Sequence, residues 1–137
     1  MANMTVTAPE STNPRRPGRL NSITFTHTAA ATGGGSVASQ AITGTLLRVH
    51  TDNKGDDSWD LSFTASGAVI WEQTALGTGA QSLPICVGWD GLTPDGATDA
   101  LAYGIPVLNE TITCTTANMS ATGGADGHEI TIIYRED

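Results

Sequence analysis

The sequence is poor in lysine, aromatic residues and cysteine, and each shortage narrows the possible class of protein. Only one lysine is present and 15% of the residues are charged, which argues against exposed helices, whose solvent faces usually carry several charges. No apolar run approaches the length that crosses a bilayer. The first residues lack the basic and apolar regions of a signal peptide. We therefore expect a chain made in the cytosol, with no membrane partner.

What the sequence has instead is threonine and glycine, with 21 threonines and 16 glycines. Threonine is β-branched and favours strands over helices. Between residues 20 and 137 we count eight or nine short strand patterns, separated by turn signals at intervals typical of a sandwich. These patterns predict an all-β chain with one antiparallel β-sandwich, or a β-tulip or jelly-roll-like body.

A predicted hairpin between Trp59 and Trp71 holds two of the three tryptophans. Apolar and polar residues alternate over the first strand, and Gly67 suits the reversal that follows. We expect Trp59 and Trp71 to fill the interior, because a chain with few large side chains needs them there. The alternative is a stacking platform for a sugar or a base, and exposure of Trp59, Trp71 and Trp89 distinguishes the two.

Three other positions carry a prediction about strand placement. Gly44 is expected at a bulge or kink, and Pro106 on an edge strand or at a bulge. The stretch from Glu129 to Arg135 is apolar on both sides, which predicts a strand in the middle of a sheet or beneath a neighbouring subunit.

No pattern of catalytic residues is present, so we expect no enzyme, no cofactor and no metal ion. His27, His50 and His128 are isolated in the sequence, although the fold could still assemble a three-histidine site. The acidic stretches 52–60 and 89–99 invite a calcium interpretation, but their spacing does not fit an EF-hand loop. Their residues are also the ordinary residues of tight turns.

The two cysteines, Cys86 and Cys114, lie in strand-like surroundings with no histidine nearby. That arrangement gives no zinc pattern. In a chain made in the cytosol, we expect both to be buried thiols rather than a disulfide.

Residues 1–19 are predicted to be an extended N-terminal arm, separate from a body formed by residues 20–137. Three of the six prolines fall in the arm, and it has no apolar periodicity. The body holds thirteen acidic and three basic residues, a balance that disfavours nucleic acid as a partner. We expect the arm to bind a partner by strand addition and by charge-assisted hydrogen bonds. The residues concerned are Thr5, Val6 and Thr7 for the strand, and Arg15, Arg16 and Arg19 for the charges.

The chain resembles small virion proteins of tailed bacteriophages, above all capsid decoration (cement) proteins. The resemblance rests on the Pro-Arg-Arg-Pro-Gly-Arg end of the arm, on the Thr/Gly/Ala-rich stretches 23–28 and 42–47, and on the last strand, 129–134. It implies a β-sandwich or β-tulip on the outer capsid surface, often a trimer, that binds and stabilises neighbouring major capsid proteins. It transfers no functional residue. The alternatives are a tail or head–tail connector component and, from another class, a carbohydrate-binding module.

Overall fold

The computed structural model describes residues 4–7, 18–27, 34–53, 58–88, 101–119 and 128–136. These ranges form twelve strands and contain no helix. The all-β prediction is confirmed, but the number of strands is larger than the eight or nine expected. The excess comes from strands of three or four residues, which are too short for an alternating pattern to reveal.

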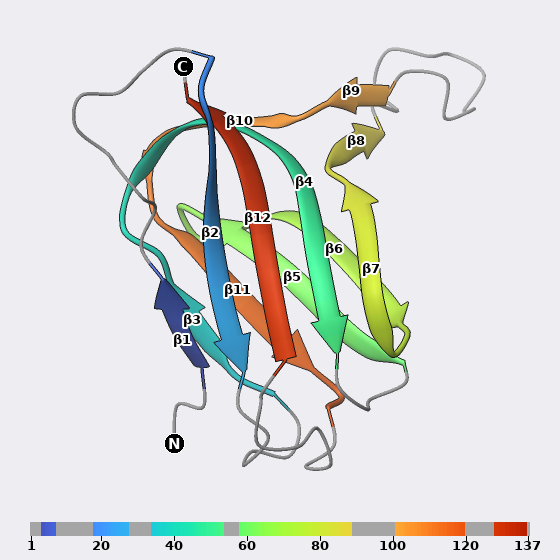
Figure 1. Ribbon diagram of the computed structural model, residues 1–137. Helices are drawn as coiled ribbons and strands as arrows, with labels where there is room; N and C mark the ends of the chain where they lie inside the picture. The colour runs from blue at the N-terminus through green and yellow to red at the C-terminus, as the bar shows by residue number, and fades with distance from the viewer. Residues whose placement is uncertain are drawn as a thin grey trace.

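Two antiparallel sheets face each other and form a β-sandwich (Figure 1). In sheet 1, β1, β2, β12, β4 and β10 lie side by side, and β7 also pairs with β4. Sheet 2 has the order β3, β11, β5, β6, and β8 and β9 form a separate two-stranded ribbon. The strands of sheet 1 are β1 (Met4–Thr7), β2 (Leu20–His27), β12 (His128–Glu136), β4 (Ile42–Asn53), β10 (Ile105–Glu110) and β7 (Gly79–Pro84). The others are β3 (Ser36–Ala38), β11 (Ile112–Ala117), β5 (Trp59–Ala65), β6 (Ala68–Leu76), β8 (Cys86–Gly88) and β9 (Leu101–Tyr103).

The predicted hairpin is formed by β5 and β6. Ser66 and Gly67 make a two-residue turn with φ of 52° and 80°, so both adopt the left-handed conformation that fits the twist of a hairpin. Every second residue of β5 is buried and faces sheet 1. Trp59 has no exposed surface, and its Nε1 donates a hydrogen bond of 3.0 Å to the carbonyl oxygen of Gly77. Trp71 is only half-buried, and its ring stacks on that of Phe63 with centroids 5.4 Å apart.

Strand β12 lies in the middle of sheet 1, paired with β2 on one side and β4 on the other. This position confirms the first of the two predictions for residues 129–135, a strand in the middle of a sheet. The inner face of sheet 1 packs its apolar side chains against those of sheet 2. The core includes Ile23, Phe25, Leu46, Val49, Ile130 and Ile132 from sheet 1 and Trp59, Leu61, Phe63, Ile112 and Cys114 from sheet 2.

Gly44 and Pro106 lie where β4 pairs with β12 and β10. A Cβ atom on Gly44 would come within 2.3 Å of the carbonyl oxygen of Arg135, so the close approach of β12 requires glycine here. As predicted, an irregularity lies beside Gly44, because the register of β4 against β10 shifts between the Gly44–Val107 and Ile42–Glu110 pairs. The register of β4 against β12 shifts beside Leu47. Pro106 lies in β10 at the edge of sheet 1, as predicted.

Candidate functional site

The N-terminal strand residues expected to bind a partner are found in this chain's own sheet. Thr5, Val6 and Thr7 pair with Thr26, Phe25 and Thr24 of β2. Val6 is half-buried and packs against the core. The segment forms a strand, and the edge that it covers belongs to the same chain; strand addition to a partner stays a prediction.

Arg19, which the sequence assigned to the arm, also has a partner within the chain. Its Nε donates a hydrogen bond to Oε2 of Glu136 at 2.6 Å, in an ion pair with a carboxylate that is almost fully buried. The backbone of the same segment is held as well, because Gly18 N donates to Glu136 O and Glu136 N donates to Arg19 O. The body thus begins by Gly18, and Arg15 and Arg16 lie outside the described residues.

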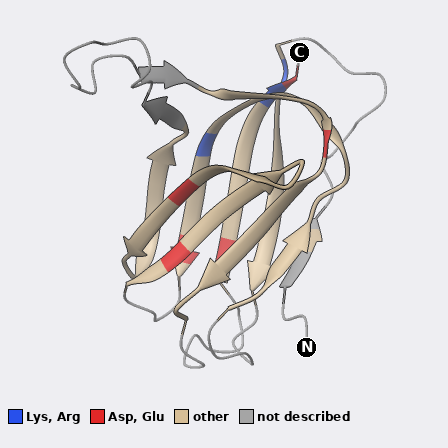
Figure 2. Cartoon of the chain, turned by 180° about the vertical axis from the view of Figure 1, so that it is seen from behind, with Lys and Arg blue, Asp and Glu red and all other residues tan. Residues whose placement is uncertain are grey.

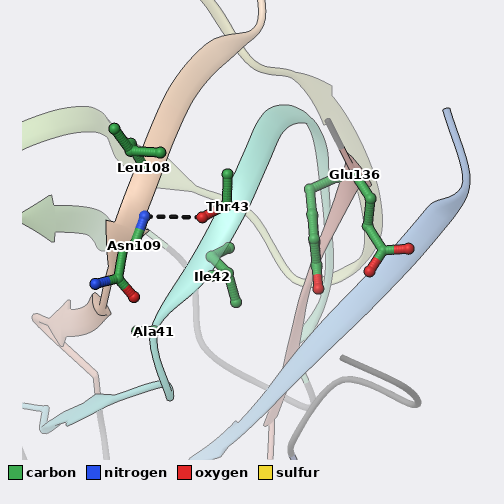
Figure 3. A pocket seen from close by; sticks show the side chains of 7 residues that line it. Ala41, Ile42, Thr43, Leu108, Asn109 and Glu136 are labelled. Atoms are coloured by element: carbon green, nitrogen blue, oxygen red, sulfur yellow. Dashed lines mark hydrogen bonds between the residues drawn. The ribbon is translucent and has the colours of Figure 1, made fainter. Parts of the chain in front are cut away.

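A recess of about 340 Å³ opens beside this ion pair, between the start of β4, β10 and the end of β12 (Figure 3). Its rim carries Leu108, which is 76% exposed. Asn109 N donates a hydrogen bond of 2.9 Å to Thr43 Oγ1 and fixes the two walls relative to each other. The recess is lined by Ala41, Ile42, Thr43, Leu108, Asn109, Tyr134 and Glu136.

The ionisable groups of the recess show no arrangement suited to catalysis. Burial raises the pKa of Tyr134, the neighbouring Glu136 carboxylate raises it further, and Arg19 acts in the opposite direction. Tyr134 therefore keeps its proton at neutral pH, and the Glu136 carboxylate is engaged by Arg19. Neither group is set up as a nucleophile with an adjacent base.

The three histidines are not brought together. His27 and His128 lie opposite each other on β2 and β12, both fully buried, with ring centroids 5.9 Å apart and an interplanar angle of 17°. His50 lies exposed on β4, with side-chain alternation placing it on the outer face of sheet 1. Within the described ranges, no three histidine, cysteine, aspartate or glutamate side chains gather closely enough to hold a metal ion. Within the acidic stretch 52–60, residues 54–57 lie outside the described residues. The whole of the stretch 89–99 also lies outside them.

The outer face of sheet 1 separates charges of opposite sign. Arg48 lies opposite Ile133 on the neighbouring strand, whereas Asp52 lies directly opposite Glu129. A recess of about 170 Å³ beside the two carboxylates is also lined by His50, with Thr51, Ala80 and Thr131 completing it. Alternation along β4 could have placed Arg48 and Asp52 on one face, but the meeting of Asp52 with Glu129 depends on the register.

The outer face of sheet 2 has a smaller polar recess of about 140 Å³, lined by Asp60, Leu61, Ser62, Glu72, Thr74, Thr115 and Ala117. The two oxygens of Asp60 are both engaged, because Oδ1 accepts from Ala75 N and Oδ2 accepts from Asn118 Nδ2. Figure 2 shows this side of the molecule, where acidic residues lie on the front strands and basic residues lie toward the end that holds the C terminus.

The aromatic and thiol predictions have mixed outcomes. Trp59 is buried as predicted, Trp71 is half-buried at the edge of sheet 2, and Trp89 lies outside the described residues. Cys114 is a free, buried thiol, as predicted, and burial raises its pKa far above the usual range. Cys86 is in β8, and its side chain is outside the described part of the structure.

No protein-family model matches the chain, and no curated protein matches it. Among solved structures, it is similar to the C-terminal CBM6 of LamC, a marine laminarinase from Zobellia galactanivorans, with 9% identity and a TM-score of 0.47 over 98% of this chain and 100% of that one. The CBM36-1 domain of a multidomain xylanase from the hindgut metagenome of Trinervitermes trinervoides has 8% sequence identity and a TM-score of 0.39. That match covers 95% of this chain and 96% of the other. Dimeric latent PorU from Porphyromonas gingivalis has 13% sequence identity and a TM-score of 0.39, and the match covers 98% of this chain and 13% of that one. At these identities the likeness concerns the fold and says nothing about a ligand.

The described ranges contain no helix of the length and apolar character needed to cross a membrane.

Proposed function

We propose that this chain is a non-catalytic structural protein of a virus particle, a capsid decoration protein that lies on the outer capsid surface and links neighbouring major capsid proteins. The composition and the stretches that resemble such proteins suggest the setting. The observation that supports the proposal is strand β1, in which the N-terminal segment is extended and pairs along the edge of sheet 1.

Strand β1 is a short strand at the edge of sheet 1. It pairs with β2 over four residues at the edge of sheet 1, and Val6 packs against the core. The chain from Ala8 to Arg19 that connects it to β2 includes three prolines. A short edge strand on such a connection can occupy the corresponding edge of a neighbouring subunit with the same backbone pairing. Repeated over many copies, even weak links of this kind oppose the separation of capsid subunits.

The test uses a variant that begins at Ala8, which removes β1 and keeps the Arg19–Glu136 ion pair. We expect it to unfold cooperatively, with somewhat lower stability because Val6 and four residue pairs are lost. Mixed with undecorated capsids of the same virus and pelleted, it should bind at least tenfold more weakly than the full chain. The capsids should also lose heat resistance.

A matched variant with Arg15→Ala and Arg16→Ala keeps β1 and removes only the two arm charges. We expect a smaller loss of binding that disappears at high salt, because exposed charge contacts are screened. Equal capsid occupancy and equal heat protection by the full chain and the variant that begins at Ala8 would rule out the arm as the link. If the full chain does not bind capsids at all, the proposed function itself is wrong.

Carbohydrate binding is the second candidate, favoured by the polar recess on the outer face of sheet 2. The Glu72 carboxylate and the hydroxyl groups of Ser62, Thr74 and Thr115 are suited to hydrogen bonds with sugar hydroxyls. Against it, Trp59 is fully buried and is not available for stacking on a sugar ring. Calorimetric titration with soluble β-glucan and xylan tests this candidate. Binding that Glu72→Gln abolishes supports it, and no heat at millimolar sugar removes it.

A further inference from the structure

We propose that the outer face of sheet 1 binds the same face of a second copy of this chain about a two-fold axis. In this dimer, Arg48 of each copy enters the acidic recess beside Asp52 and Glu129 of the other. The proposal does not depend on the capsid role, because it uses neither β1 nor the arm.

The spacing of charges along β4 makes this face complementary to itself. Alternation places Arg48, His50 and Asp52 on one side of the strand, and β12 adds one neighbour to each. The basic and acidic rows are four residues apart, a distance of about 13 Å along the strand. The rows are Arg48 with Ile133, His50 with Thr131, and Asp52 with Glu129.

The two-fold axis lies between the two faces, perpendicular to the strands, at the His50–Thr131 row. Rotation about this axis reverses the strand direction of the second copy. Arg48 of one copy then stands over the acidic row of the other, and the same contact forms a second time by symmetry. A shift of two residues along the strand would bring Arg48 over His50 instead of the carboxylates. The charges therefore favour a single alignment of the two copies.

The acidic row is hollowed in a way that suits an inserted side chain. The recess of about 170 Å³ beside Asp52 and Glu129 includes Ala80, a small residue of β7. The Glu129 side chain is exposed, and Asp52 lies directly opposite it on the neighbouring strand. A guanidinium group that enters the recess can form charge-assisted hydrogen bonds with the Glu129 carboxylate.

Arg48 is held on the face from which it must reach the partner. It is exposed, and its Nη1 donates a hydrogen bond of 2.7 Å to Ser82 Oγ on β7. A guanidinium group has five N–H donors, so this bond fixes the side chain and leaves donors for two carboxylates. On the same face, the hydroxyl groups of Thr24 and Thr131 lie 3.1 Å apart and bond to each other, so their pairing does not need a partner molecule.

The size of the face sets the expected strength of the dimer. Without β1, the face is four strands wide; with strands about 4.8 Å apart and about 20 Å long, it presents roughly 400 Å² per copy. This is below the roughly 800 Å² of a standard interface. We therefore expect a dimer with a dissociation constant in the micromolar range that weakens as salt increases. It would be a dimer and not the trimer expected from the sequence.

Sedimentation equilibrium of the full chain at low and high salt, with two charge reversals, tests the proposal. Arg48→Glu and Glu129→Arg should each weaken the dimer at least tenfold, since each places like charges together. In the double variant, the two substituted side chains form an ion pair of reversed polarity, while the unchanged Asp52 still repels the glutamate at position 48. The double variant should therefore dimerise at least about threefold more tightly than either single variant. Glu72→Arg, which changes the net charge as Glu129→Arg does but lies on sheet 2, should leave the dimer unchanged.

A chain that remains monomeric at several hundred micromolar in low salt would overturn the proposal. So would a dimer that either single reversal leaves intact, or a double variant that dimerises no more tightly than the single variants. Thr131→Tyr provides a variant without a change of charge, because tyrosine is favourable in strands and would hold the two faces apart at the axis. Circular dichroism identifies any variant that fails to fold, and a folded Thr131→Tyr variant that still dimerises would contradict this geometry.

Discussion

The two tryptophans of the β5–β6 hairpin should differ sharply in their contribution to stability. Trp59 has no exposed surface, and its indole nitrogen donates to Gly77 O. Truncation to alanine removes the whole buried ring, at a cost of about 3–5 kcal/mol. It also leaves the Gly77 carbonyl without this donor, which adds about 1 kcal/mol. Trp71 is half-buried, so Trp71→Ala should cost about 2 kcal/mol, much of it from the lost stacking on Phe63.

Urea unfolding followed by far-ultraviolet circular dichroism measures both changes. With a slope of about 2 kcal/mol per molar urea, a loss of 4 kcal/mol lowers the midpoint by about 2 M. Trp59→Phe provides an intermediate case, because it keeps a buried ring but loses the hydrogen bond and part of the volume. If Trp71→Ala cost as much as Trp59→Ala, or if Trp59→Ala cost less than 1 kcal/mol, the packing described for this hairpin would be wrong.

Two further predictions concern ionisable groups. Because burial raises the pKa of the Cys114 thiol, the folded chain keeps a proton that the unfolded chain loses above about pH 8.5. The free energy of unfolding should therefore fall by about 1.4 kcal/mol per pH unit beyond that point. In urea titrations at pH values from about 8 to about 10.5, stability should fall less steeply with pH in Cys114→Ala than in the unmodified chain. Equal slopes of stability against pH in the two proteins would contradict this. Arg19→Ala leaves the buried Glu136 carboxylate without its ion-pair partner and should lower the free energy of unfolding by about 1–3 kcal/mol. Recovery of stability in the double variant Arg19→Ala with Glu136→Gln would identify the charge as the cause. No loss of stability in Arg19→Ala would show that the ion pair contributes nothing.

The sequence predicted those parts of the fold in which local pattern and tertiary environment agree. The alternation from Trp59 to Phe63 and the turn at Gly67 gave a hairpin that the structure confirms. The apolar residues on both sides of β12 indicated a strand in the middle of a sheet or beneath a neighbouring subunit, and β12 is central in sheet 1. In these segments the residues that bury themselves also mark the strand, so periodicity alone is sufficient.

The candidate site was less predictable because its residues meet through register and chain ends. Arg19 and Glu136 are 117 positions apart, and only the closure of sheet 1 brings them together. The pairing of Asp52 with Glu129 likewise depends on one alignment of β4 with β12, and a slip of one residue would turn the side chains to the opposite face. Single-sequence patterns contain no information on such long-range alignment, so the recess and the charged face could not be located in advance.

The central position of β12 also bears on how the molecule is made. β12 follows every other strand of sheet 1 in the sequence, yet β2 and β4 pair with it and not with each other. While residues 128–136 are still inside the ribosome, the facing backbone edges of β2 and β4 have no strand between them. The apolar side chains of Ile23 and Phe25 then lack their neighbours on β12. Sheet 1 therefore closes only after almost the whole of the described chain has emerged, and a fragment that ends after β11 would expose strand edges that favour aggregation.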